Sequence, residues 1–258
     1  MSDAFGRSLA SGVRPRRVAD LEALHLDVAF QPIVDLRSGA LFAVESLARC
    51  RIDDFRNPLV LFERAVVESC CGKLGRSVRE VTFSHRLDLP MFVNLHPNEL
   101  SEHWLVRPDD PLAFHEYGVY LEITESAAFT HFELCMGALK EICSRTGAHL
   151  AIDDLGAGHS NLKRIVDMEP DFVKLDLVLT RGIDKNRRQQ ILVTQVVKLC
   201  TELGARVVAE GIETVNELLA VRDTGAQFGQ GYLLGRPANP VPDVFWPLGA
   251  SPTSARSA

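Results

Sequence analysis

Short apolar runs alternate with longer amphipathic runs along most of the 258-residue chain. Within the short runs polar and apolar positions mostly do not alternate, which is typical of strands buried on both faces. The runs predict strands at 28–34, 41–48, 91–95, 118–123, 149–153, 172–176, 205–210 and 226–232. The amphipathic segments between them predict helices.

Two segments of the second half show the clearest helical periodicity. Residues 186–204 place apolar residues at helical spacing and end at Gly204, which is a helix stop signal. Residues 131–147 end in the same way at a glycine. Strand and helix repeat through about eight strands, which predicts an α/β fold of the (β/α)8 barrel type. An open doubly wound sheet is the alternative.

The composition of the chain is informative mainly through its charge. Hydrophobic residues make up 46% of the chain, the net charge is −6, and the pI is about 5.8. The chain therefore offers no basic field for a nucleic-acid polymer or an anionic membrane. An anionic ligand would need local positive charge from an arginine, a lysine or a metal ion.

The chain ends and the cysteines give expectations about organisation and location. We expect a polar N-terminal extension over 1–24, one barrel domain over 25–248, and a disordered tail over 249–258. The N-terminus lacks the apolar segment of a secretory signal, and no run of about eighteen apolar residues predicts a membrane span. None of the six cysteines forms a C-x-x-C pair, so we expect free thiols and a cytoplasmic protein.

Polar side chains recur where the predicted strands end. In barrels of this type the catalytic residues lie at the C-terminal ends of the strands. The positions are Glu45, Asn94, Glu122, Asp153, Asp154, Lys174, Asp176, Glu210, Glu213 and Gln230. One acid in an apolar strand is commonly a satisfied core group, but so many charges cannot share a dry cleft without compensation.

The adjacent acids Asp153 and Asp154 indicate how that compensation arises. The candidate ligands are oxygen donors without cysteine or histidine, which suits Mg²⁺ or Mn²⁺ better than Zn²⁺. Two such ions about 3.5–4 Å apart are the usual apparatus of phosphodiester hydrolysis. The turn that follows has Asn161 at the third glycine position of G-x-G-x-x-G, which argues against a dinucleotide-binding loop.

These residues together resemble the EAL domain, the family of cyclic di-GMP phosphodiesterases. The resemblance covers about residues 25 to 240, and the motifs stand in family order with family-like spacing. They are FQPIVD (30–35), ESLAR (45–49), FVNLHP (92–97), LEITES (121–126), IDDLGAGHS (152–160), FVKLD (172–176), VVAEGIET (207–214) and QGYLLGRP (230–237). Each motif alone is weak, but the ordered set is highly specific.

The resemblance implies a modified TIM barrel with one antiparallel strand. It also implies hydrolysis of cyclic di-GMP to the linear dinucleotide pGpG, with two Mg²⁺ or Mn²⁺ ions and usually as a homodimer. Regulation would then come through dimerisation, a regulatory protein partner or expression.

The same resemblance assigns roles to the acidic residues and the lysine. Glu45 matches the signature metal ligand and acts in catalysis, Lys174 would hold the attacking water or stabilise phosphate charge, and Glu210 would be a general base or metal-linked ligand. The implied metal ligands are Glu45, Asn94, Glu122, Asp153, Asp154 and Glu210.

Further positions match the substrate pocket of the family. Arg49 matches an arginine that contacts the ligand's phosphate, and Gln31 approaches a guanine. Glu125 matches a glutamate that anchors the loop at 154–160. Supporting pocket positions are Asp176, Glu213 and Gln230.

The chain also departs from the family pattern, without losing any ligand or the lysine. The substituted positions are Ser46, Cys50, His96, Leu155, Ala157, His159 and Asn161. Ala157 and His159 lie in the loop that links metal binding to dimer contacts in the family. Two alternatives therefore stay open: a weak or inactive domain that acts as a cyclic di-GMP receptor or protein-binding adaptor, and another Mg²⁺-dependent barrel enzyme, such as one that stabilises an enolate.

Overall fold

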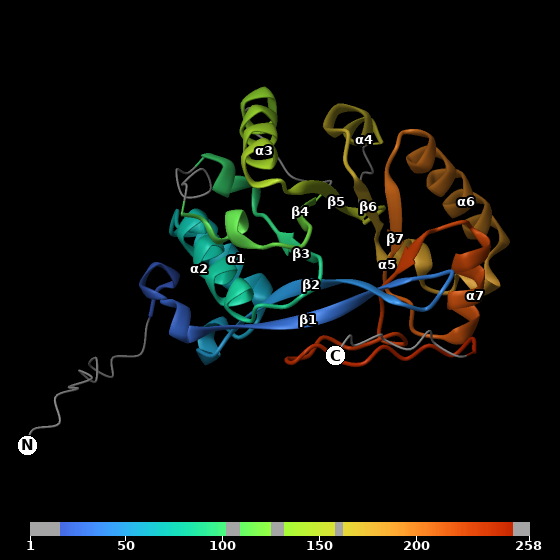
Figure 1. Cartoon of the computed structure of the whole chain (residues 1–258), viewed down its shortest axis with the longest axis horizontal. Coiled ribbons are helices and arrows are strands. Elements are labelled where there is room, and N and C mark those ends of the chain that lie inside the picture. The colour runs from blue at the N-terminus through green and yellow to red at the C-terminus, as the bar shows by residue number, and fades with distance from the viewer. Residues whose placement is uncertain (1–15, 102–108, 125–131, 158–161, 250–258) are drawn as a thin grey trace, which may run out of the picture.

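Eight strands close into a barrel in chain order. The computed structural model describes residues 16–101, 109–124, 132–157 and 162–249. The strands are β1 (Leu26–Asp35), β2 (Leu41–Cys50), β3 (Met91–Asn94), β4 (Val119–Thr124), β5 (His149–Leu155), β6 (Phe172–Leu175), β7 (Arg206–Ala209) and β8 (Phe228–Gly229). Each strand pairs with its neighbour and β8 pairs back with β1, and Figure 1 labels the strands from β1 to β7. The barrel prediction is confirmed and the open sheet is excluded.

Strand β1 runs against the direction of the other strands. It pairs antiparallel with both β2 and β8, whereas every other neighbouring pair is parallel. An antiparallel pair needs only a tight turn, while parallel strands need a crossover, so β1 and β2 form a hairpin. The hairpin register places Gln31 opposite Glu45. The expected modified TIM barrel is therefore confirmed.

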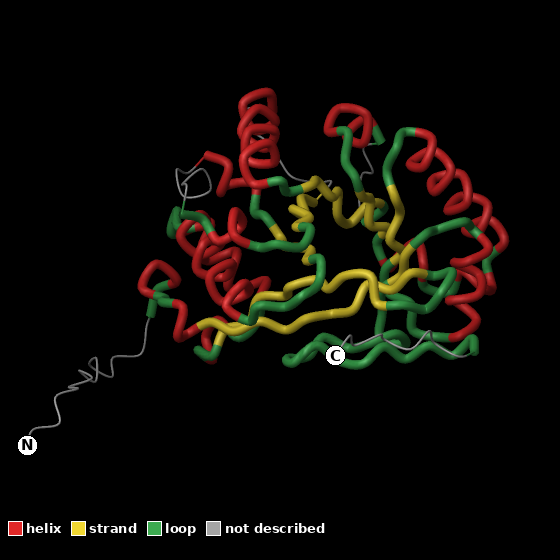
Figure 2. Tube along the Cα trace, viewed as in Figure 1, coloured by secondary structure: helices red, strands yellow, loops and turns green. Residues whose placement is uncertain are grey.

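Helices flank the barrel on several sides, and loop segments run beside the β1–β2 hairpin (Figure 2). The α-helices are α1 (Pro58–Val67), α2 (Cys71–Ser84), α3 (Phe132–Thr146), α4 (Lys163–Met168), α5 (Leu177–Thr180), α6 (Arg187–Glu202) and α7 (Val215–Asp223). Short 3-10 helices are η1 (Val18–Asp20), η2 (Ala23–His25), η3 (Asp53–Phe55), η4 (Pro97–Ser101), η5 (Pro111–Phe114) and η6 (Ile183–Lys185). The predicted helices at 131–147 and 186–204 correspond to α3 and α6.

The lumen of the barrel contains two layers of side chains. Successive residues of a strand point to opposite faces, so inward positions lie two residues apart. One inward set, the aromatic layer, is the apolar cluster Ile33, Ala43, Phe92, Tyr120, Ala151, Phe172, Val208 and Phe228. The other set, the polar layer, lies two residues closer to the barrel mouth: Gln31, Glu45, Asn94, Glu122, Asp153, Lys174, Glu210 and Gln230. Each strand or its immediate end thus supplies one member of each layer.

The outer faces of the strands are apolar as well. Residues such as Phe30, Leu121 and Val173 are buried in the larger core cluster between strands and helices, which explains the continuous apolar runs in the sequence. Val18 and Leu21, from the predicted N-terminal extension, are also buried in this cluster.

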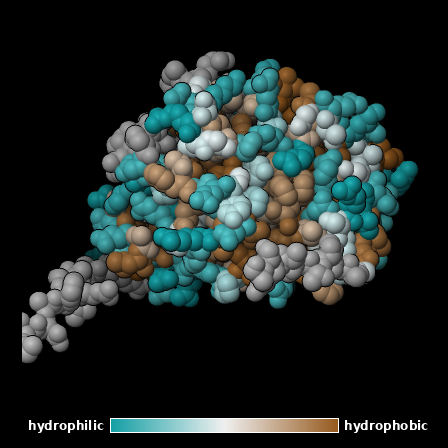
Figure 3. Space-filling view, in the orientation of Figure 1, coloured by the Kyte–Doolittle hydropathy of each residue, from teal (hydrophilic) through white to brown (hydrophobic). Residues whose placement is uncertain are grey.

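One face of the molecule is mainly polar (Figure 3), and the fold has neither a membrane-spanning helix nor a disulfide bond among the described residues. Figure 3 shows one face as mostly hydrophilic, with apolar patches between the polar side chains. Among the described residues, no helix combines the length and the apolar character needed to cross a bilayer. All six cysteines are free.

Candidate active site

Lys174 lies at the centre of the polar layer, buried on β6. Its Nζ is 2.6 Å from Glu210 Oε1 and 2.7 Å from Glu122 Oε1. It is also 3.2 Å from Glu45 Oε2 and 3.2 Å from Asp153 Oδ1. Four carboxylates around one ammonium carry a large excess of negative charge when all are ionised. In a buried site such an excess must be relieved by protonation or by further cations.

Two amides donate hydrogen bonds to the Glu45 carboxylate on β2. Asn94 Nδ2 donates to Glu45 Oε1 at 3.0 Å, and Gln230 Nε2 donates to Glu45 Oε2 at 2.6 Å. Gln230 Nε2 also lies 3.1 Å from Gln31 Oε1, and Gln31 donates in turn to the carbonyl of Gly235 at 3.2 Å. This hydrogen-bond chain joins the middle of β1 and β2 to the ends of β3 and β8 and fixes the Glu45 carboxylate.

The surroundings of the acids push their pKa values apart. Burial raises the pKa of Glu45, but the Lys174 ammonium and the amides of Gln230 and Asn94 outweigh it, so the net shift is downward. Burial and the Glu45 charge hold the pKa of Glu122 well above its usual range. Burial lowers the pKa of Lys174, but the surrounding carboxylates outweigh it and raise that pKa.

Asp153 and Asp154 reach the same site although they are adjacent on β5. Asp154 has a left-handed φ of 59°, and the register with β6 shifts between Ile152 and Leu155. The normal alternation of the strand is broken here, so both carboxylates approach Glu210. Burial and the neighbouring Asp153 raise the pKa of Asp154 to about 6. Burial, reinforced by Asp153, raises the pKa of Glu210 to about 8 despite the nearby Lys174.

The donor set fits a hard divalent cation. Asp153, Asp154 and Glu210 each offer a carboxylate oxygen, and these atoms lie within 4.8 Å of one another. Glu122 Oε2 is buried and accepts no hydrogen bond within the described part of the chain, which leaves it available to a ligand. Oxygen-only sets of this kind suit Mg²⁺, Mn²⁺ or Ca²⁺. A cation here would relieve the excess negative charge that raises these pKa values.

Two pockets open from the polar layer. The larger, of about 670 Å³, is lined by Glu45, Asn94 and Glu122 and also by a group of apolar side chains. The smaller, of about 360 Å³, is lined by Glu45, Asp153, Asp154, Glu210 and other residues. Glu45 belongs to both, so the pockets meet at the acidic cluster. Pockets of this size hold small organic ligands.

The remaining predicted site residues lie around these pockets, with two exceptions. Arg49 lines the larger pocket, and its Nη1 donates to the carbonyl of Ala48 at 2.9 Å. Glu213, Gln31 and Gln230 line the smaller pocket. Asp176 lines neither pocket. Its side chain instead caps α5 by accepting the N–H of Val178 at 2.8 Å. Glu125 lies outside the described residues.

The sequence did not indicate several of the residues that line the two pockets. Arg181 lines the smaller pocket and forms an ion pair with Glu213. Phe62 and Leu59 of α1 line the larger pocket. Arg181 follows the FVKLD motif by five residues without a pattern of its own, and Phe62 belongs to an apolar run that reads as helix core. Only the placement of the helices against the barrel reveals them.

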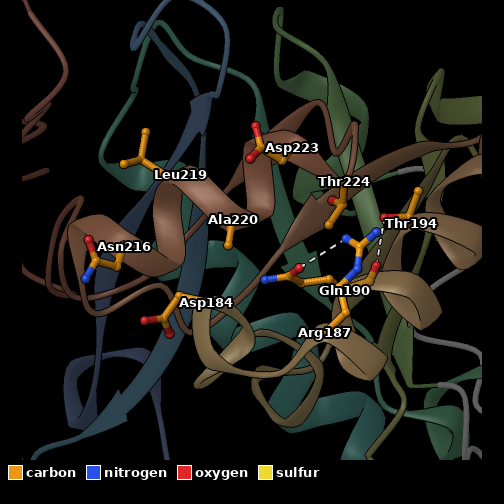
Figure 4. Close-up of a pocket in the computed structure, with 9 residues that line it drawn as sticks. All are labelled: Asp184, Arg187, Gln190, Thr194, Asn216, Leu219, Ala220, Asp223 and Thr224. Carbon is orange, nitrogen blue, oxygen red and sulfur yellow. Dashed lines mark hydrogen bonds between the residues drawn. The ribbon is translucent and has the colours of Figure 1, made fainter.

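A third pocket, of about 420 Å³, lies between α6 and α7 (Figure 4). Its side chains include Arg187, Asp184 and Asp223, and Arg187 Nη1 lies 3.4 Å from Gln190 Oε1. It shares no lining residue with the other two pockets and contains none of the predicted site residues. The acidic cluster and this outer pocket are therefore separate features.

Comparison with known proteins identifies the family of the chain. The family model for the EAL domain matches residues 16–237. The antirepressor BluF of Escherichia coli K12 is 26% identical over 85% of this chain. Cyclic di-GMP phosphodiesterase PdeR of the same organism is 28% identical over 88% of it. The matches span 56% of BluF and 36% of PdeR, so this chain corresponds to only part of these longer relatives.

Solved structures show the same likeness. The calcium and cyclic di-GMP complex of Klebsiella pneumoniae BlrP1 has a TM-score of 0.77 at 29% identity, covering 86% of this chain and 58% of that one. A manganese and cyclic di-GMP complex of BlrP1 has a TM-score of 0.70 at 29% identity, covering 83% and 56%. With the closed mixed barrel and a family match over most of its length, this chain belongs to the EAL domain family.

Proposed function

We propose that the protein is a metal-dependent phosphodiesterase that hydrolyses cyclic di-GMP to linear pGpG. The observation that carries the proposal is the Lys174 ammonium within 3.2 Å of four carboxylates at the barrel mouth. Family membership supports it, as do PdeR, named as a cyclic di-GMP phosphodiesterase, and BlrP1, solved with cyclic di-GMP. These relatives also favour a phosphodiester over the substrates of other Mg²⁺-dependent barrels.

The residues of the polar layer would divide the work. Two Mg²⁺ or Mn²⁺ ions would be held by Glu45, Asn94, Glu122, Asp153, Asp154 and Glu210. When bound, such ions polarise the scissile phosphate and make the attacking water more acidic. Lys174 would position the water and stabilise charge on the phosphate. Glu210 would accept a proton as the water oxygen bonds to phosphorus. The bond between phosphorus and the 3′-oxygen would break, and that oxygen would take up a proton from solvent.

The two pockets would receive the two halves of the substrate. Arg49 would contact a phosphate with its guanidinium, and Gln31 would approach a guanine. Glu213, Gln230 and Asp176 would support the pocket, and Glu125 would anchor the loop at 154–160. We also propose that the protein is a cytoplasmic homodimer and that a regulatory protein partner controls its activity. Size-exclusion chromatography with light scattering tests the dimer.

Turnover of cyclic di-GMP tests the proposed function. Purified protein is incubated with cyclic di-GMP and Mg²⁺ or Mn²⁺, and pGpG is followed by liquid chromatography. The wild-type protein should form pGpG, and Lys174→Ala and Glu45→Ala should not. Equal product from the wild type and these variants would refute the assignment.

One relative favours a second candidate function. BluF is named an antirepressor, and Ala157 departs from the family pattern beside the acidic cluster. A chain of this kind would act as a cyclic di-GMP receptor or a protein-binding adaptor. Tight binding without turnover would select the receptor. Absence of both binding and turnover would select the adaptor.

A further inference from the structure

Two parallel rings line the larger pocket. Phe62 lies on α1 and His96 follows β3, and both belong to the lining that also includes Glu45 and Asn94. Their ring planes are 8° apart, and the ring centroids are 6.4 Å apart. One pocket therefore contains both the acidic cluster and a pair of flat aromatic surfaces.

The distance between the Phe62 and His96 rings is close to what a third flat ring between them would need. Carbon atoms in optimal contact are about 3.5 Å apart, so a ring held on both faces needs about 7 Å between its neighbours. The ring centroids are 6.4 Å apart, which is the upper limit of the separation between the two planes, so the rings must move apart by about half an ångström to admit a base. A shift of the partly buried Phe62 ring away from His96 by that distance would admit the base.

Hydrogen bonds hold His96 in place. Its ring Nδ1 accepts the backbone N–H of Asn98 at 3.2 Å, and its backbone N–H donates to Glu99 Oε1 at 3.0 Å. Arg79 donates to Glu99 Oε2 at 2.7 Å and to Asp110 at 2.9 Å, and these three charged side chains are buried. One wall is thus preorganised, which lowers the entropy lost when a ligand binds.

The wall that carries Phe62 is apolar. Leu59 and Val66 lie three residues before and four residues after Phe62 on α1, so all three share one face of the helix, and all three line the pocket. Asn57 caps this helix by accepting the N–H of Leu59 at 3.0 Å, and Pro58 begins it. The wall therefore offers a fixed hydrophobic surface to the flat face of a base.

We propose that Phe62 and His96 form a slot that stacks one guanine of cyclic di-GMP between their rings. The inference rests on the proposed function, which puts a phosphate at the acidic cluster and leads a base into this pocket. Aromatic side chains bind nucleic-acid bases through their π faces. His96 stands where the family pattern has serine, so the second wall of the slot is a property of this chain.

The test measures cyclic di-GMP affinity by calorimetry in Ca²⁺, the cation of a BlrP1 complex, for the wild type and variants. His96→Ser and Phe62→Ala should each raise Kd about tenfold, as expected for loss of one base stack. His96→Tyr keeps a flat ring and should restore Kd to within about threefold of the wild type. Val67→Ala is the matched control, because Val67 lies on α1 but does not line the pocket.

Each outcome decides between the slot and its alternatives. Unchanged Kd in His96→Ser and Phe62→Ala, with a wild type that binds, overturns the slot and leaves the proposed function standing. A lower melting temperature with unchanged Kd means that the rings only pack the wall, and this also overturns the slot. A wild type that neither binds nor hydrolyses cyclic di-GMP overturns the proposed function and the slot together.

Discussion

The barrel lumen holds an aromatic layer and a polar layer that lie only two residues apart on each strand. Phe172 and Lys174 of β6 illustrate the contrast, because both side chains are almost fully buried. Phe172 contacts Tyr120 and Phe92 with ring centroids 4.7 and 5.1 Å away, whereas Lys174 contacts four carboxylates. Both positions lie on β6 with buried side chains, so the difference between the layers comes from residue type.

The energetic roles of the two layers differ accordingly. Burial of the aromatic layer stabilises the fold through the hydrophobic effect and through ring contacts. Burial of the polar layer costs desolvation energy that ion pairs only partly offset. The aromatic layer therefore supports a strained acidic cluster at the mouth, and substitutions in the two layers should affect different measurements.

The largest expected effect is on catalysis, from Lys174→Met in the polar layer. In the proposed mechanism the Lys174 ammonium would stabilise charge on the phosphate and position the water, so its loss should lower kcat at least about 10²-fold. Steady-state pGpG formation in saturating Mn²⁺ measures it, and circular dichroism checks that the barrel is folded. A folded variant with kcat within tenfold of the wild type would contradict the role of Lys174.

The next effect is on stability, from Phe172→Ala in the aromatic layer. The substitution leaves a cavity among packed rings and should lower the free energy of unfolding by about 3–5 kcal/mol. Urea denaturation measures it. Phe172→Leu is the matched control and should cost less, because it fills more of the cavity. Equal losses of unfolding free energy in the two variants would show that the loss does not depend on the size of the cavity.

The strands could be predicted because each one carries a buried apolar run between helices. Most boundaries agree within two residues, but β8 contains only Phe228 and Gly229 instead of residues 226–232. Gln230 still donates its backbone N–H to the carbonyl of Ala209, but a turn closed by the N–H of Leu234 on the carbonyl of Gly231 follows at once, so the strand ends there. Local sequence does not show where a strand stops pairing with its neighbours.

The polar layer could also be predicted, since charged residues at the ends of apolar strands are conspicuous. The left-handed turn at Asp154 could not, because the sequence alone shows two adjacent acids that would point to opposite faces. Arg181 and Phe62 reach the pockets only through the placement of α5 and α1. Residues on helices and loops around a barrel thus stay hidden until the tertiary structure is known.

Binding of a metal ion at the polar layer should raise the stability of the folded protein, by less than the Phe172→Ala substitution lowers it. An ion that binds only the folded protein adds about 2.7 kcal/mol at a hundredfold excess over its Kd, or about 5–10 °C in Tm. Thermal melts with and without Mn²⁺ measure the shift. Asp153→Asn should reduce it, whereas Asp223→Asn in the outer pocket between α6 and α7 should keep it. Equal shifts in the two variants would place the cation elsewhere.

The smallest effect concerns the Arg206 side chain, whose guanidinium lies at the end of the lumen opposite the polar layer. Arg206 begins β7 and places its guanidinium 4.1 Å from the ring centroid of Phe172. Arg206→Met keeps the long apolar stem but removes the charge, so it should lower the free energy of unfolding by about 0.5–1 kcal/mol. Arg206→Lys, the control, should lose less. Neither variant should change kcat for cyclic di-GMP, because Arg206 contacts the aromatic layer and not the polar one. A clear fall in kcat at unchanged stability would show that the two layers are coupled, and the division between them would fail.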